Sequence, residues 1–281
     1  MPVVPSPPPT PASTLRGRWL GMVVVLVLLC GLSACGGSAK PPPAALETPT
    51  PSPTSGIQDD RVHQPGVDSR ARAERVRKMA EGGATLLRVD LVWSIVAPTP
   101  PADATNPDDP AYQWASYDQL LTVAKANHLE VLFTVYGTPA WAADPAFARF
   151  VGATDRIVRP RDPEEFGAFA VAAAKRFAPR GVRLWEGWNE PNIKLFFYPQ
   201  YERQGDRWVQ SSPKHYSALL KSFSAGIKSV DPKAIVAGGV FAPTGDKCGA
   251  SCPVKPTDAG PPNRMRAGDF LAWTWGRRWT W

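Results

Sequence analysis

Glu190 carries the strongest chemical signal in the sequence, within the segment WEGWNEPN at residues 185–192. The segment ends a predicted strand over residues 182–188, and the neighbouring indoles of Trp185 and Trp188 would shield the carboxyl group from water. Shielding of that kind raises the pKa of a carboxylic acid and suits a general acid. The alternative is a solvated loop acid before a proline, because a three-residue match is weak by itself. A catalytic Glu190 requires a second carboxyl group.

The second carboxyl group is not evident from the sequence. Cleavage of a glycosidic bond uses two carboxyl groups, one as acid and one as nucleophile or base. Glu186 faces the same way as Glu190, but four strand residues at about 3.3 Å each separate them by roughly 13 Å. Retaining enzymes need about 5 Å and inverting enzymes up to about 9.5 Å. The remaining candidates are Glu202 and Asp206 in a long loop, and Asp59 and Asp60 on the first strand.

The elements that would position Glu190 alternate between strand and helix. Strands are predicted over residues 56–58, 84–93, 130–136, 182–188 and 232–242. Apolar residues at helical spacing predict helices around residues 73–80, 117–124, 163–177, 213–227 and 265–275. Alternation of this kind predicts parallel βαβ units.

The links between these elements favour a (β/α)8 barrel of the TIM type. Links from helix to strand are short, whereas links from strand to helix are long: residues 97–115, 137–161 and 191–211. Long loops at the carboxyl ends of the strands form the working face of such a barrel. A doubly wound sheet is the alternative, but no glycine-rich phosphate-binding motif follows a strand. Only about five of the eight units are present, which suggests an interrupted or frameshifted reading frame.

The N-terminus predicts export. Arg16 and Arg18 precede the apolar run of residues 19–32, which is too short to span a bilayer but fits a signal peptide. Residues 32–36 resemble the lipobox of bacterial lipoproteins, which implies cleavage before Cys35 and a lipid on its sulfur. An ordinary secretory signal is the alternative. We therefore expect a signal peptide at residues 1–34, a lipid-anchored linker rich in proline, threonine and serine at 35–55, and a barrel domain at 56–281 on the outer face of the cytoplasmic membrane.

The cysteines and the net charge limit which metal ions and binding partners the chain could have. In an oxidising compartment Cys248 and Cys252 predict a small disulfide-closed loop, and a metal site there lacks a second ligand pair. The net charge is +7, and removal of residues 1–34 takes away two arginines and leaves +5. The positive charges are scattered, which gives nucleic-acid binding little support. No metal or cofactor is predicted.

Three segments resemble the clan A glycoside hydrolases, such as the family 5 cellulases and the family 39 xylosidases and iduronidases. They are LLRVDLVW at residues 86–93, VYGTPAW at 135–141 and WNEPN at 188–192. The resemblance covers residues 56 to about 275. It implies that Asn189 binds a sugar 2-hydroxyl and Glu190 is the acid/base residue.

The same resemblance implies that Arg88 supports the charge of the nucleophile; the alternative for Arg88 is a salt bridge to Asp90. Aromatic residues that match or adjoin the family's sugar-lining positions are Trp93, Tyr136, Trp141 and Trp188, although each is as readily explained by packing. The family's nucleophile ends a seventh strand, which this sequence does not reach.

The leading hypothesis is a lipid-anchored, retaining glycoside hydrolase acting on a β-linked polysaccharide or glycoside. The chain as written is expected to lack its nucleophile, and to be inactive or poorly folded. The first alternative is a non-catalytic carbohydrate-binding lipoprotein that uses the aromatic residues of 196–208. The second is a membrane-proximal scaffold without affinity for sugar.

Overall fold

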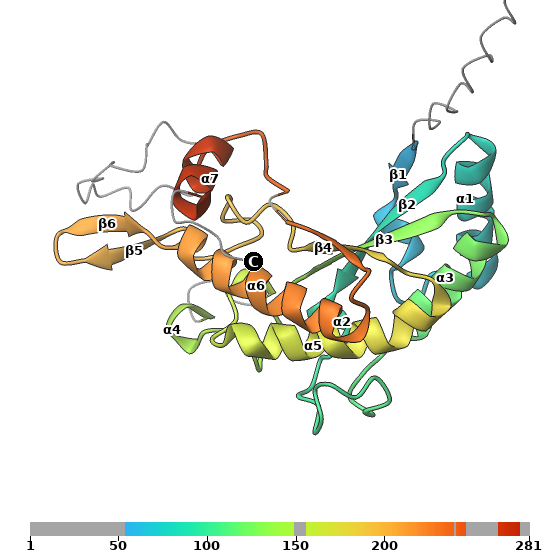
Figure 1. Ribbon diagram of the computed structural model, residues 1–281, viewed down its shortest axis with the longest axis horizontal. Helices are drawn as coiled ribbons and strands as arrows, with labels where there is room; N and C mark the ends of the chain where they lie inside the picture. The colour runs from blue at the N-terminus through green and yellow to red at the C-terminus, as the bar shows by residue number, and fades with distance from the viewer. Residues whose placement is uncertain (1–53, 149–155, 239, 246–263, 276–281) are drawn as a thin grey trace, which may run out of the picture. The chain divides into compact units, whose positions relative to one another are not determined.

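The main sheet contains five parallel strands in the computed structural model, which describes residues 54–148, 156–238, 240–245 and 264–275 (Figure 1). The strands lie in the order β1-β2-β3-β4-β7. This order follows the chain without a reversal, as in a barrel and unlike a doubly wound sheet. The fold is therefore α/β and forms part of a (β/α)8-type barrel, which confirms the prediction. The strands are Gly56–Gln58 (β1), Leu86–Val92 (β2), Glu130–Tyr136 (β3), Leu184–Gly187 (β4) and Ile235–Ala237 (β7).

A long helix follows each of the first four strands, and most residues of each predicted apolar stripe are buried, the rest partly so. These helices are Ser69–Glu81 (α1), Ala115–Ala126 (α3), Pro163–Phe177 (α5) and Ser212–Val230 (α6). The start of α5 shows why the boundaries were predictable, because the Asp162 side chain accepts the backbone N–H of Glu164 at 2.9 Å and Pro163 occupies the first turn. The shorter helical elements are Asp60–Val62, Trp93–Val96 (α2), Pro145–Ala148 (α4), Ala178–Arg180 and Ala267–Trp275 (α7).

The two faces of the sheet differ in chemistry. On one face, Phe133 of β3 contacts Tyr117 of α3 and Phe177 of α5, and its strand neighbour Trp185 packs beside it. This face is buried by the helices. Because side chains alternate along a strand, the other face carries the polar residues of β2, β3 and β4. They are Arg88, Asp90, Thr134 and Glu186.

The strand predicted over residues 232–242 is shorter and more exposed than expected. Only Ile235–Ala237 forms β7, and 64% of Ile235 is exposed. Within the described residues β7 pairs with β4 alone, so it lies at the edge of the sheet. The prediction of a buried strand is wrong here because burial depends on a second neighbour, which an apolar run does not specify.

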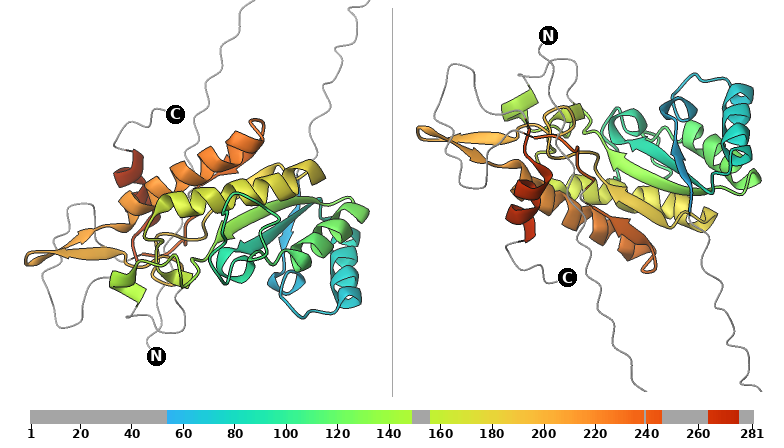
Figure 2. Two further views of the ribbon diagram at one scale, coloured as in Figure 1. Left: turned by 90° about the horizontal axis from the view of Figure 1, so that it is seen from below. Right: turned by 90° about the horizontal axis from the view of Figure 1, so that it is seen from above.

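Helices α5 and α6 run side by side along the sheet (Figure 2). Glycine permits their close approach: a Cβ atom at Gly226 of α6 would lie 2.5 Å from the carbonyl oxygen of Gly167 in α5. A Cβ at Gly167 would in turn lie 2.1 Å from Ser222 Oγ. Any larger residue at either position must separate the helices.

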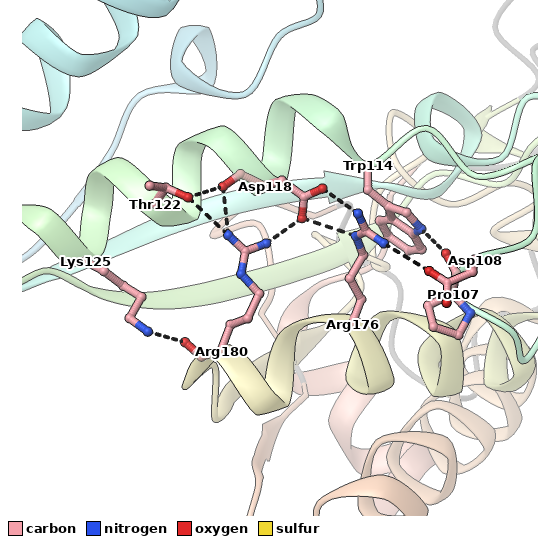
Figure 3. A network of polar contacts seen from close by, with 8 residues as sticks. All are labelled: Pro107, Asp108, Trp114, Asp118, Thr122, Lys125, Arg176 and Arg180. Carbon is pink, nitrogen blue, oxygen red and sulfur yellow. Dashed lines mark hydrogen bonds and ion pairs between the residues drawn. The ribbon is translucent and has the colours of Figure 1, made fainter.

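An ionic cluster that we call the helix clasp joins α3 to the end of α5 (Figure 3). Asp118 of α3 accepts from Arg176 at 2.6 Å and from Arg180 at 2.5 Å, so both carboxylate oxygens are engaged. The guanidinium of Arg176 also lies 5.8 Å from the ring centre of Trp114. The clasp ties together two helices that cover neighbouring strands.

An antiparallel hairpin replaces part of the loop expected after the fourth strand. Its strands are Tyr201–Gln204 (β5) and Arg207–Gln210 (β6), joined by Gly205 and Asp206. Gly205 has φ +59°, a conformation that glycine adopts at little cost. A Gly-Asp pair between two short runs is a hairpin signal, and it was available in the sequence.

Parts of the predictions fall outside the described residues. These are the signal peptide, most of the linker, Cys35, Cys248 and Cys252. Across the described ranges, the structure contains no helix with the length and apolarity needed to cross a membrane.

Candidate functional site

Arg88 organises a polar cluster at the carboxyl ends of the strands. Its Nε donates to Glu186 Oε2 at 2.8 Å, and its Nη2 donates to Asn189 Oδ1 at 3.0 Å. Arg88 lies on β2, whereas both acceptors lie on or just after β4, so the side chain reaches across β3. Thr134 of β3 completes the contact by donating to Glu186 Oε2 at 2.5 Å. We call Arg88, Asp90, Thr134, Glu186 and Asn189 the strand-end cluster.

Strand register explains why these side chains meet. Asp90, Thr134 and Glu186 are paired across β2, β3 and β4, so they form one row on the face of the sheet opposite the helices. Glu186 is only 4% exposed. A buried carboxylate is tolerated when it is paired and hydrogen-bonded, and here Arg88 and Thr134 supply both conditions. The contacts therefore fix the position of Arg88 as well as that of Glu186.

Asp90 adds a second buried carboxyl group to the cluster. It is 7% exposed, accepts from Tyr136 OH at 3.1 Å and lies 3.4 Å from Arg88 Nη1. Burial raises the pKa of Asp90 from 3.8 to about 6, and the positive charge of Arg88 opposes that rise. Asp90 therefore changes charge in mildly acidic solution, next to an arginine that also holds Glu186 and Asn189.

The first strand joins the cluster through Gln58. Arg88 Nη1 donates to Gln58 Oε1 at 2.5 Å, and Gln58 Nε2 donates to Asp60 Oδ1 at 2.7 Å. Four successive strands, β1 to β4, thus contribute to one hydrogen-bonded network on the face of the sheet opposite the helices. Convergence of side chains from several strand ends is how barrel enzymes build their active sites.

Glu190 follows this cluster in an unusual backbone conformation. Its φ is +41° and that of Trp188 is +77°, although neither residue is glycine. Such conformations cost of order 1–3 kcal/mol each and gather at functional sites. The backbone is held there because Trp188 N donates to Val135 O at 2.9 Å and Ile193 N donates to Glu190 O at 3.2 Å. The half-buried Glu190 side chain makes no hydrogen bond or ion pair with any residue that the structure describes.

The structure brings some of the predicted site residues together and separates others. Arg88, Asn189 and Tyr136 join the network described above, and Arg88 also makes the salt bridge to Asp90 that was its alternative explanation. Trp141 is half-buried, and its indole donates to Ala97 O at 2.9 Å. Trp141 therefore remains near the surface and meets Trp93 edge to face, with ring centres 5.6 Å apart.

The prediction that Trp93 and Trp188 contact a sugar does not fit the structure. Trp93 is 1% exposed and Trp188 is 0% exposed. Trp93 stacks on Phe169 of α5, and the indole of Trp188 donates to Phe196 O at 2.9 Å. Both rings fill the space between the strand ends and α5, so they support the site without presenting a face to solvent. The sequence pattern identified aromatic positions but not the side on which each ring lies.

The proposed second carboxyl groups occupy varied positions. Glu202 on β5 pairs with Arg159 and lies 3.7 Å from His215, and Asp206 is fully exposed at the hairpin tip. Asp59 pairs with Arg61 and Arg75. The sequence interpretation missed Thr134 and the role of Glu186, and it named Asp90 only as a salt-bridge partner of Arg88. The alternation Arg88-x-Asp90 on one strand was an available signal, because it places both side chains on one face.

Across the described residues, no group of three or more histidine, cysteine, aspartate or glutamate side chains is arranged to hold a metal ion. The strand-end cluster itself offers carboxyl, guanidinium, hydroxyl and amide groups. These are groups that bind sugar hydroxyls and exchange protons.

Comparisons with known proteins are limited to the level of the fold. The sequence matches no protein-family model, and a search of curated proteins gives no match. The chain is similar to the solved structure of a family 39 glycoside hydrolase from Bacteroides cellulosilyticus WH2, with 23% identity, a TM-score of 0.42 and coverage of 66% of this chain and 31% of that one.

Two further solved structures have comparable similarity. One is a monomeric beta-xylosidase from Caulobacter crescentus CB15, at 17% identity and TM-score 0.47, with coverage of 66% of this chain and 36% of that chain. The other is a GH39 enzyme from Xanthomonas axonopodis pv. citri, at 20% identity and TM-score 0.47, with coverage of 66% and 35% respectively. The chain spans about a third of the length of each solved structure.

Proposed function

We propose that the chain is a glycoside hydrolase that cleaves O-glycosyl bonds of a β-linked polysaccharide or glycoside. The observation that carries the proposal is the position of Arg88, which binds Glu186 and Asn189 together directly before the strained Glu190. Glu190, whose carboxyl group has no side-chain partner among the described residues, follows Asn189 of this Arg88-centred network directly in the chain, which supports the proposal.

In the proposed reaction each group has a distinct task. In the first step a second carboxylate bonds to the anomeric carbon while Glu190 protonates the departing glycosidic oxygen. In the second step Glu190 accepts a proton from the water that displaces this carboxylate from the anomeric carbon. Asn189 is held by Arg88 with its amide N–H groups left to donate to a sugar hydroxyl. Arg88 adds positive charge that stabilises a carboxylate bound nearby. A retaining mechanism requires a second carboxylate as nucleophile, and Glu186 is already committed to Arg88 and Thr134.

The test is a hydrolysis assay of the whole chain on a panel of β-linked polysaccharides and aryl β-glycosides. The proposal predicts release of reducing sugar or aglycone from at least one substrate, and loss of that release in Glu190→Gln when the leaving group is poor. Such release would overturn the expectation from the sequence that the chain lacks its nucleophile. Glu81→Gln is the matched control, because Glu81 is an exposed glutamate at the end of α1 that pairs with Arg77. Glycan binding without hydrolysis, unchanged in Glu190→Gln, would instead support a carbohydrate-binding protein.

Lipid anchoring is a separate part of the proposal, and the sequence of residues 16–36 supports it. Labelling of the expressed chain with radioactive palmitate in a bacterial host should mark the wild type and fail in Cys35→Ser. Labelling that persists in the variant would contradict the anchor, and an unlabelled chain found in the medium would indicate an ordinary secretory signal.

A further inference from the structure

A small pocket lies beside the strand-end cluster, where β3 ends. It has a volume of about 330 Å³ and is lined by Tyr136, Arg156, Ile157, Leu195 and Phe196. Ligand sites commonly occupy about 300–1,000 Å³, so this one suits a single ring with a short substituent. Its walls come from three separate segments of the chain.

Backbone hydrogen bonds fix those three segments relative to one another. Thr138 N donates to Arg156 O at 3.0 Å, and Tyr198 N donates to Ile157 O at 2.8 Å. The carbonyl of Phe196 accepts the buried indole of Trp188. The pocket is therefore preformed, and its occupant does not have to order a loop.

The lining combines rings with a single charge. Tyr136 and Phe196 meet edge to face, with ring centres 5.8 Å apart and planes at 77°. Tyr136 directs its hydroxyl away to Asp90, which leaves its ring as an apolar wall. Two aliphatic side chains, Ile157 and the 67%-exposed Leu195, complete the apolar surface.

Arg156 supplies the charge. Its side chain is exposed, and within the described part of the chain no carboxylate lies within ion-pair distance of it. The guanidinium acts on Tyr136, because burial and Asp90 raise the pKa of that phenol whereas Arg156 opposes the rise. Arg156 lines the same pocket as Tyr136 and offers a hydrogen-bonding fork to an anion there.

We propose that this pocket binds a ring-bearing carboxylate, with its ring packed against Tyr136 and Phe196 and its carboxylate on Arg156. Apolar walls without a charge would accept any ring, and a lone surface arginine would accept any anion. The combination selects a ligand that carries both. If the proposed function holds, this ligand is the acidic aromatic leaving-group end of the glycoside; binding of the free acid does not rest on that function.

The test uses 3-phenylpropionate and its neutral amide as probes, with binding to the whole chain followed by NMR chemical-shift perturbation. The acid should bind with a dissociation constant on the order of millimolar, as expected for a fragment, and the amide more weakly. Arg156→Gln should weaken the acid about fivefold and leave the amide unchanged. Leu195→Glu adds a negative charge at the rim of the pocket, which repels the carboxylate of the probe. This variant should also weaken binding of the acid and leave binding of the amide unchanged.

Lys194→Gln is the matched control. Lys194 is an exposed cation on the same loop, but it lies 5.7 Å from the centre of the Tyr198 ring, which is not part of the pocket lining. Its variant should bind the acid as the wild type does. Equal binding of acid and amide, or equal losses in Arg156→Gln and Lys194→Gln, would overturn the proposal. Selective binding without glycoside hydrolysis would uphold the pocket and count against the proposed function alone.

Discussion

Two arginine–carboxylate clusters use the same chemistry in different surroundings. In the strand-end cluster Arg88 holds Glu186, whose side chain is 5% exposed. In the helix clasp Arg176 and Arg180 hold Asp118, whose side chain is 26% exposed (Figure 3). The distances are similar, at 2.8 Å against 2.6 and 2.5 Å. Geometry alone therefore does not distinguish a functional cluster from a structural one.

Burial and direction distinguish them. The helix clasp lies between α3 and the end of α5, where water can solvate either charge if its partner is removed. Its contacts only hold the two helices together. The strand-end cluster lies on the face of the sheet opposite the helices and includes a second buried carboxyl group, that of Asp90. Its last residue, Asn189, directly precedes Glu190, whose backbone is strained. A cluster that is costly to bury and does not hold helices together calls for a functional explanation.

The largest expected difference in stability follows from removing each arginine. Arg88→Met leaves Glu186 buried without its cation and should lower the free energy of unfolding by about 3–5 kcal/mol. Urea unfolding followed by circular dichroism measures this change. The double variant Arg88→Met, Glu186→Leu should recover much of the loss, because it removes the uncompensated charge. A loss under about 1 kcal/mol in Arg88→Met would show that the two clusters are energetically alike.

The second prediction concerns the pH dependence that Asp90 introduces. Because its pKa is raised from 3.8 to about 6, stability from the neutral form is fully present below pH 3.8 and is lost as the pH rises through 6. The free energy of unfolding of the wild type, relative to Asp90→Asn, should therefore fall by about 2 kcal/mol between pH 4 and pH 7. The difference between the two proteins removes the effect of His215, whose pKa is lowered to about 4 mainly by burial. A difference that is constant over this pH range would contradict the raised pKa of Asp90.

The uncharged, close contact between α5 and α6 should have an intermediate effect on stability when it is disturbed. Gly226→Ala forces a Cβ against the Gly167 carbonyl and should destabilise the fold by about 1–3 kcal/mol. Gly268→Ala in α7 is the matched control, because its Cβ would meet nothing within 4 Å. That substitution should be neutral or slightly stabilising, since alanine is the better helix former. Thermal unfolding of both variants checks the prediction.

The smallest effect is expected in the helix clasp. Arg180→Met should lower the free energy of unfolding by less than about 1 kcal/mol, because water can solvate the released carboxylate. The loss should shrink further in 1 M salt, which screens exposed pairs. A loss close to that of Arg88→Met would remove the distinction between the two clusters.

Much of the fold could be predicted from the sequence, but the contacts of the site could not. Apolar spacing and the cap at Asp162 are local signals, and they located the main helices and strands. The contact of Arg88 with Glu186 depends on the register of β2, β3 and β4, and a single sequence does not contain that information. Glu186 was therefore considered only along its own strand, as a neighbour of Glu190.

Aromatic side chains show the same limit. Trp93, Trp141 and Trp188 all occur near strand ends, yet only Trp141 retains partial exposure. The positive φ of Trp188 turns the chain after β4 and places the indole against Phe166 of α5. Residue type predicted where aromatic rings occur, whereas the backbone conformation decided which of them face solvent.

The most direct test of Glu190 as the acid/base residue compares leaving groups in one variant. Phenyl and 2,4-dinitrophenyl β-glycosides of the same sugar should be hydrolysed by the wild-type chain and by Glu190→Gln, with kcat/KM measured for each. We predict a loss of about 10²–10⁴-fold for the phenyl glycoside, which needs a proton on its leaving oxygen, and a far smaller loss for the dinitrophenyl glycoside, which does not. Equal losses on both substrates, or none on either, would contradict the account.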